Sequence, residues 1–225
     1  MEDNNTVVSS TRAEDYGYGL AYQLAREQLS RITDIERHCL RSGAEYLPEK
    51  RAVAVDYINR RYLLGLESAE VSLVAEAGEV PIRDKLLILH YFLQAKGTQT
   101  SGRMITYKEL KEGASYFPTF AKRAIAPVLN QFGREPARLL DAARFIGGFR
   151  ADYGDMAVTV PAFSRISLTW VLWAEDAEFP ADGSVLFDGN ISDYLTNDDI
   201  HTLCEIIAWK LVRLDRTGGG NSGKR

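Results

Sequence analysis

Three carboxylates, one guanidinium and one indole could do chemistry here, and all lie near the strand-forming run ISLTWVLWA. Asp155 precedes the neighbouring run, Arg165 stands just before this one, and Trp173 lies near its end. Asp176 and Asp188 follow in and after an acidic loop. Carboxylates beside a guanidinium can exchange protons with a substrate or hold a divalent metal, and an indole on a half-polar face can form the floor of a pocket. These five are our candidate pocket or binding residues, and none is assigned a catalytic role.

A structural explanation competes for each of these residues. Alternation puts Leu168 and Trp170 on a wholly apolar side that must face the core, and Ser167, Thr169 and Trp173 on a mixed side. Trp173 then either packs under a loop or lines a pocket. The arginine before the strand either pairs with a nearby aspartate, which fixes the strand ends, or binds an anion in a cleft.

The oxygen-rich stretch DGNISDYLTNDD has the length of an EF-hand calcium loop but not its pattern. Such a loop needs Gly at its sixth position and Glu at its twelfth, and here Asp193 and Asp199 occupy these positions. We expect these acids to cap the last helix. His201 and Cys204 are at most half of a metal site, so the sequence predicts no metal centre.

Composition and charge narrow the class of protein. Of the 225 residues, 45% are hydrophobic and 26% charged, which is ordinary for a globular chain, and the net charge of −4 argues against nucleic acid as a partner. No window approaches eighteen uninterrupted apolar residues, and the start has no signal-peptide pattern, so we expect no membrane association and a cytoplasmic protein. Cys39 and Cys204 are expected to be reduced, buried thiols.

Runs of helical and strand periodicity, rather than strict alternation, predict an α+β fold with a mainly antiparallel sheet and helices packed on it. Period-two patterns lie near 53–66, 71–74, 156–160, 166–172 and 185–187, and helical patterns lie at 16–43, 81–97, 106–145 and after 195. Leu20 and Leu24 belong to the apolar stripe of the first helical pattern, Thr106 and Glu109 have the spacing of a capping box, and we expect Pro127 to kink its helix. We expect a single domain over 15–214, between disordered segments at 1–14 and 215–225.

Four stretches taken together resemble a known family. They are KLLILHYFLQAKGTQTSGRMITYKEL, FGREPARLLDAARFIGG, GDMAVTVPAF and LTWVLWAEDAEFPADGSVLFDGNISDYLTNDDI. In their sequence and their order along the chain, these stretches resemble the domain-of-unknown-function 3786 family over about residues 16–214. The resemblance is most specific in the block that ends in Leu-Phe-Asp. The resemblance implies a setting in anaerobic bacteria and archaea, where some members are joined to a small cysteine-ligated iron–sulfur domain like that of corrinoid-protein machinery. It implies no activity.

This chain departs from the fused members because it has two cysteines rather than a cysteine quartet. A second proline, expected after Pro161, is also missing from the run 163–166. The expected function is that of a cytoplasmic accessory or binding protein of corrinoid, iron–sulfur or other anaerobic cofactor metabolism, beside an iron–sulfur or corrinoid partner that carries the metal; no cofactor of its own is named. The alternatives are a hydrolase-like enzyme that uses carboxylates, with or without a metal, and a protein–protein interaction module.

Overall fold

The strands of this protein pair in antiparallel fashion wherever the structure describes their register, and helices pack against the strands. A computed structural model describes the backbone of residues 4–75 and 78–218, and the side chains of 17–75 and 78–217. Within these residues there are nine strands. The predicted α+β class with a mainly antiparallel sheet is therefore confirmed.

The chain divides into two compact units. Unit 1 comprises residues 1–56 and 60–97, and unit 2 comprises 57–59 and 98–225. The prediction of a single domain over 15–214 concerns how these units associate, and it stays a prediction.

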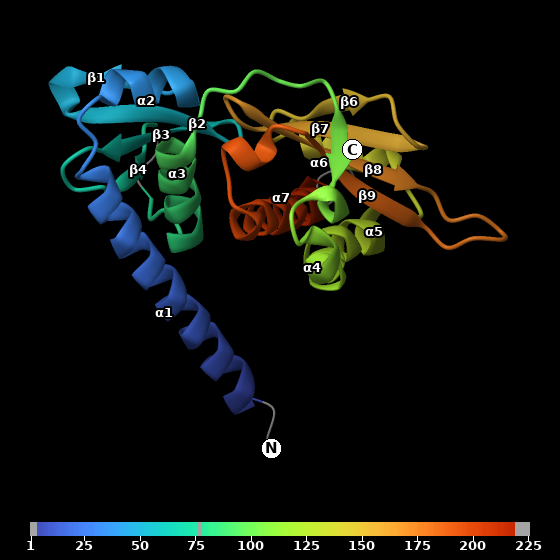
Figure 1. Ribbon diagram of the computed structural model, residues 1–225. Coiled ribbons are helices and arrows are strands. Elements are labelled where there is room, and N and C mark those ends of the chain that lie inside the picture. The colour runs from blue at the N-terminus through green and yellow to red at the C-terminus, as the bar shows by residue number, and fades with distance from the viewer. Residues whose placement is uncertain (1–3, 76–77, 219–225) are drawn as a thin grey trace, which may run out of the picture. The chain divides into compact units, whose positions relative to one another are not determined.

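Unit 1 is a small set of strands with three helices. Its strands are β1 (Glu45–Leu47), β2 (Ala52–Tyr57), β3 (Arg60–Gly65) and β4 (Val71–Leu73), in the order β4-β3-β2 with β1 beside β2. Its helices are α1 (Asn4–Leu29), α2 (Ile35–Ser42) and α3 (Ile82–Gln94), and α1 packs along α3 (Figure 1). The left-handed conformation of Gly43 ends α2, as its sequence position predicts.

Unit 2 carries the longer strands. They are β5 (Met104–Thr106), β6 (Phe149–Ala151), β7 (Met156–Phe163), β8 (Ile166–Trp173) and β9 (Asp182–Asp188), in the order β7-β8-β9-β5 with β6 beside β7. Its helices are α4 (Gly113–Phe120), α5 (Ala126–Phe132), α6 (Ala137–Arg144) and α7 (Asn197–Gly218). A π-helix, Ala121–Ile125, joins α4 to α5. Short 3-10 turns lie at Pro48–Lys50, Tyr107–Glu109 and Ile191–Asp193.

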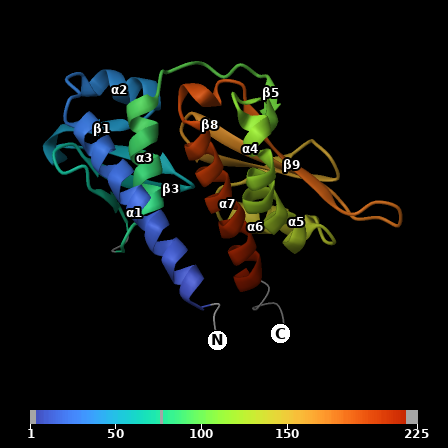
Figure 2. The same cartoon turned by 60° about the horizontal axis from the view of Figure 1, so that its bottom comes forward.

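One face of β7, β8 and β9 packs on these helices. Register places Val158, Trp170 and Val185 side by side, and all three are fully buried. Figure 2 shows α4, α5, α6 and α7 gathered together. Where these helices cover β9, the ring centroids of Phe120 and Phe187 lie 6.5 Å apart. The apolar side predicted from alternation is therefore the core of unit 2.

Local signals in the sequence explain several helix boundaries. The Thr106 N–H donates to Glu109 Oε2 at 2.7 Å, and the same pattern recurs at the start of α7, where the Thr196 N–H and hydroxyl donate to Asp199 Oδ2. Pro127, predicted to kink its helix, lies just after the π-helix; a proline has no N–H for the regular ladder, so the preceding turn widens.

The helix ends differ from the predicted boundaries. Helix α1 begins at Asn4, inside the segment 1–14 predicted to be disordered, and α7 reaches Gly218, inside the predicted tail 215–225. The remaining terminal residues lie outside the described part, so disorder there stays a prediction. Among the described residues, no helix is both long and apolar enough to cross a membrane.

Candidate functional site

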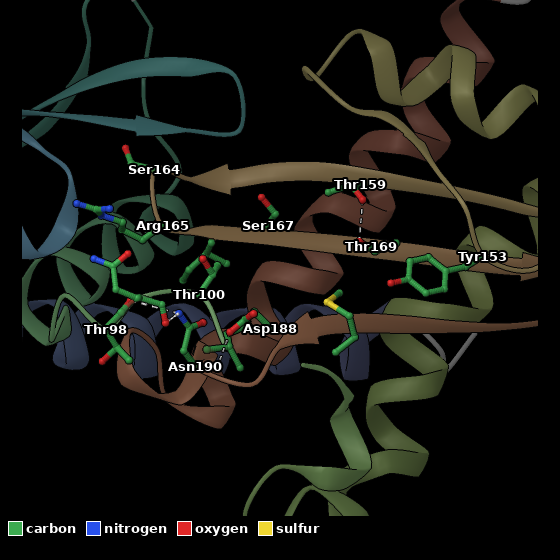
Figure 3. Close-up of a pocket in the computed structure, with 14 residues that line it drawn as sticks. Thr98, Thr100, Tyr153, Thr159, Ser164, Arg165, Ser167, Thr169, Asp188 and Asn190 are labelled. Atoms are coloured by element: carbon green, nitrogen blue, oxygen red, sulfur yellow. Dashed lines mark hydrogen bonds between the residues drawn. The ribbon is translucent and has the colours of Figure 1, made fainter. Parts of the chain in front are cut away.

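A pocket of about 410 Å³ lies in unit 2, on the face of β7, β8 and β9 that is turned away from the helices. We call this face the pocket face. Fourteen residues line the pocket, and six carry serine or threonine hydroxyls: Thr98, Thr100, Thr159, Ser164, Ser167 and Thr169. In Figure 3, Arg165 lies at one end and Tyr153 at the other, with Ser167 and Thr169 between them. The volume falls in the range of small-molecule sites.

Strand register brings the hydroxyls together. Thr159 on β7 is paired with Thr169 on β8, and their hydroxyl oxygens lie 2.8 Å apart. Partners across an antiparallel pair share a face, and so do residues two apart, so Ser167 and Asp188 lie on the same face. The floor of the pocket is thus set by the backbone and not by loose surface side chains.

The carboxylate of Asp188, at the end of β9, holds one wall of the pocket in place. Its Oδ1 accepts from the Ser101 N–H and hydroxyl, each at 2.9 Å, and from the Asn190 N–H at 3.0 Å, while Oδ2 accepts from the Gly102 N–H at 2.8 Å. Burial acts to raise the pKa of Asp188, but the bonds from Ser101, Asn190 and Gly102 outweigh it, so the pKa lies below its usual value. The carboxylate therefore stays ionised as the anchor of this wall.

That wall is the segment 98–102, which has no helical or strand hydrogen bonds of its own. Besides Asp188, the Asn190 amide donates to the carbonyls of Thr98 and Gln99, at 3.3 and 3.1 Å, and the Tyr194 hydroxyl donates to the Thr98 carbonyl at 2.5 Å. The segment is flanked by Gly97 and Gly102, both with positive φ. Side chains anchored in the sheet and in the loop after β9 thus shape the wall.

Arg165 supplies the positive charge of the pocket, and it stands in the tight turn between β7 and β8. This charge acts on the nearby Tyr194 hydroxyl. Burial raises the pKa of Tyr194, the charge of Arg165 lowers it, and the charges of Asp193 and Asp188 raise it further. All four groups therefore act at the same end of the site. Asp193 accepts from the Thr98 hydroxyl at 2.8 Å, so it too serves the wall.

The family of this chain is shown by its sequence. Residues 34–209 match the model of a family described as Domain of unknown function (DUF3786). The chain belongs to the DUF3786 family. No curated protein and no solved structure matches this DUF3786 chain.

Two of the five candidate residues, Arg165 and Asp188, line the pocket of this DUF3786 chain, and the other three lie outside its lining. Asp155 accepts the Ala174 N–H at 2.8 Å where β8 ends, and Asp176 Oδ1 accepts the N–H groups of Glu178 and Phe179 in a turn. These bonds lower the pKa of Asp176.

Trp173 lies at the same end of β8 as the Ala174 N–H. The residue is 44% exposed, and its backbone pairs with that of Asp182. Trp170, predicted to be core, is 1% exposed. The five candidates therefore fall at two ends of one strand rather than in one cluster.

Sequence reasoning missed the residues that close the pocket. Thr98, Gln99 and Thr100 come from the polar run between Gly97 and Gly102, and Tyr153 comes from the turn after β6. The signal available was a polar segment bracketed by glycines after an amphipathic helix, which indicates a shaped loop. Nothing in the sequence says that this loop meets the end of β9.

The two cysteines are buried. Burial, followed by the charge of Glu36, raises the pKa of Cys39 to about 11, and burial raises that of Cys204. They belong to different units. Within the described residues, no group of three or more His, Cys, Asp or Glu side chains gathers as a metal site would.

Proposed function

We propose that this DUF3786 protein is a binding protein, and that its ligand is a small polar molecule held in the pocket of unit 2. The observation that carries the proposal is a set of six hydroxyls and one guanidinium that converge on a cavity of about 410 Å³. Hydroxyls both donate and accept hydrogen bonds, so a concave set of them is suited to a ligand with several polar atoms.

The positions of the carboxylates favour binding over carboxylate-based hydrolysis. A pair of carboxylates that shares a reaction must converge on one substrate. Here Asp155 and Asp176 lie outside the pocket lining, and the oxygens of Asp188 already accept four hydrogen bonds from the protein. The concave pocket lined by hydroxyls also favours a small polar ligand over a protein partner.

We further propose that the protein acts in the cytoplasm as an accessory to an iron–sulfur or corrinoid partner that carries the metal. The burial of Cys39 and Cys204 supports this division of work, because buried thiols with raised pKa values do not present thiolates to a cluster. The protein, purified without oxygen, is mixed with a corrinoid, haem or an iron–sulfur protein. We expect a spectral shift or a complex with the corrinoid or with the iron–sulfur protein. If none of the three additions produced a spectral shift or a complex, the partner proposal would be contradicted.

The ligand proposal is tested by filling the pocket. Ser167 is exposed on β8, so Ser167→Phe should occupy the cavity and change the free energy of unfolding by less than about 0.5 kcal/mol. Ser72→Phe, at an exposed position of β4 in unit 1, is the matched control. Native mass spectrometry of protein taken from cells should show a small bound molecule in wild type and in Ser72→Phe but not in Ser167→Phe. An equal bound mass in all three proteins would contradict the proposal.

A further inference from the structure

We infer that the ligand of this pocket is a small hydroxylated carboxylate, with its carboxylate on Arg165 and its hydroxyls along Ser167 and Thr169. The inference rests on the proposed function and names the ligand class. It starts from the composition of the pocket lining, in which Arg165 is the one basic and Asp188 the one acidic side chain.

The charge of the lining decides between kinds of anion. Since Asp188 is ionised and engaged by four donors of the protein, the lining as a whole is close to neutral. A singly charged carboxylate needs one guanidinium, whose planar fork can donate two parallel hydrogen bonds to its two oxygens. A phosphate that carries two charges would need more positive charge than one arginine brings. The lining therefore favours a carboxylate over a phosphate.

The position of Arg165 suits this contact. It lies in the turn between β7 and β8, at the end of the pocket opposite Tyr153 (Figure 3). A guanidinium has five N–H donors, so it can bind a ligand while it keeps its contacts within the protein. The ligand is thereby oriented with its charged group toward the segment 98–100.

The rest of the pocket selects the remainder of the ligand. From Arg165 toward Tyr153, the floor carries Ser167 and then Thr169, whose hydroxyl is 2.8 Å from that of Thr159. Such a row offers donors and acceptors to successive ligand hydroxyls. Met104 and Tyr153 supply apolar surface beside them. A chain of carbons that bears hydroxyls and ends in a carboxylate matches this order.

The test uses three probes on the full-length protein: gluconate, its neutral analogue sorbitol, and inorganic phosphate. Isothermal titration calorimetry measures each affinity for wild type, Arg165→Gln, Arg165→Lys and Arg150→Gln. The last variant removes an exposed arginine on β6 that does not line the pocket. Gluconate should bind wild type and Arg150→Gln alike, and bind Arg165→Gln at least about 10-fold more weakly, because bonds to a charged group are lost. Arg165→Lys should fall between, since it keeps the charge but loses the fork.

Three results would overturn the inference. Sorbitol binding as tightly as gluconate, with no effect of Arg165→Gln, would mean that the carboxylate is not recognised, although the pocket would still be a binding site. Tighter binding of phosphate than of gluconate would show that the pocket recognises phosphate and not a carboxylate. Binding of no probe would reject this ligand class. The proposed function would still stand if native mass spectrometry found a small molecule on wild type but not on Ser167→Phe. If wild type carried no such molecule either, both the ligand class and the proposed function would be rejected.

Discussion

At the scale of single residues, Asp188 is the side chain on which the site most depends. We predict that Asp188→Asn lowers the free energy of unfolding by about 2 kcal/mol, because an amide offers one acceptor where the carboxylate offers two. Chemical denaturation at pH 7 measures this. Asp176→Asn is the control: both turn bonds there go to one oxygen, which an asparagine retains, so its change should stay below about 0.5 kcal/mol. Equal losses in both variants would contradict the anchoring role.

The same carboxylate should make stability depend on pH. The pKa of Asp188 is lowered in the folded protein, so its contribution is fully present above the unfolded-state pKa of about 3.9 and is lost as pH falls through the folded value. The difference in unfolding free energy between wild type and Asp188→Asn should therefore shrink below about pH 4. A difference that stays constant down to pH 2 would show that charge has no part in the anchor.

Gly113 gives a residue-scale prediction that is independent of the pocket. A Cβ at this position would lie 1.9 Å from the Tyr107 carbonyl oxygen, so Gly113→Ala should cost about 3 kcal/mol or more in thermal or denaturant unfolding. Gly19→Ala is the matched control, since nothing lies within 4 Å there and alanine favours a helix, which should stabilise by about 0.5 to 1 kcal/mol. The same sign for both substitutions would be inconsistent with this packing.

At the scale of elements, strand β8 separates core from pocket. Trp170→Ala should cost about 3 to 5 kcal/mol, whereas Trp173→Ala, at an exposed indole, should cost less than about 1 kcal/mol. Trp170→Phe should cost less than half as much as Trp170→Ala, because the buried Trp170 Nε1 has no hydrogen-bond partner among the described residues. Urea unfolding of the three variants checks the order, and a larger loss at Trp173 would reverse our assignment of faces.

How far elements could be predicted from the sequence depended on their length. Strand β8 alternates over eight residues, so both its faces could be assigned, and the Thr106–Glu109 capping box was recognised from its spacing. Strands β1, β5 and β6 have three residues each, too few to show a period, and none was predicted. Leu20 and Leu24 were placed on the apolar stripe of the first helix, yet both are more than half exposed. Propensity marks a helix, but tertiary packing decides which face is covered.

At the scale of the whole molecule, the site depends on contacts between residues far apart in the chain. Asp188 meets Ser101, and Tyr194 meets Thr98, although 87 and 96 residues separate them in the chain. Sequence patterns could place Arg165 and Asp188 among the candidates, but they could not show that Asp188 meets the segment 98–102, because spacing along the chain carries no information on such loop contacts. Family membership over residues 34–209 covers every residue that lines the pocket.

The central claim is that the pocket face of unit 2 binds a small polar ligand. The most direct measurement is a ¹⁵N–¹H NMR titration of wild-type protein with the small-molecule fraction of a cell extract. The change in amide chemical shift is measured for each residue. The account predicts shifts at the pocket-lining residues Gln99, Thr100, Arg165 and Thr169, and their loss in Ser167→Phe at the same extract concentration. Shifts confined to residues outside the pocket, or shifts unchanged by Ser167→Phe, would contradict it.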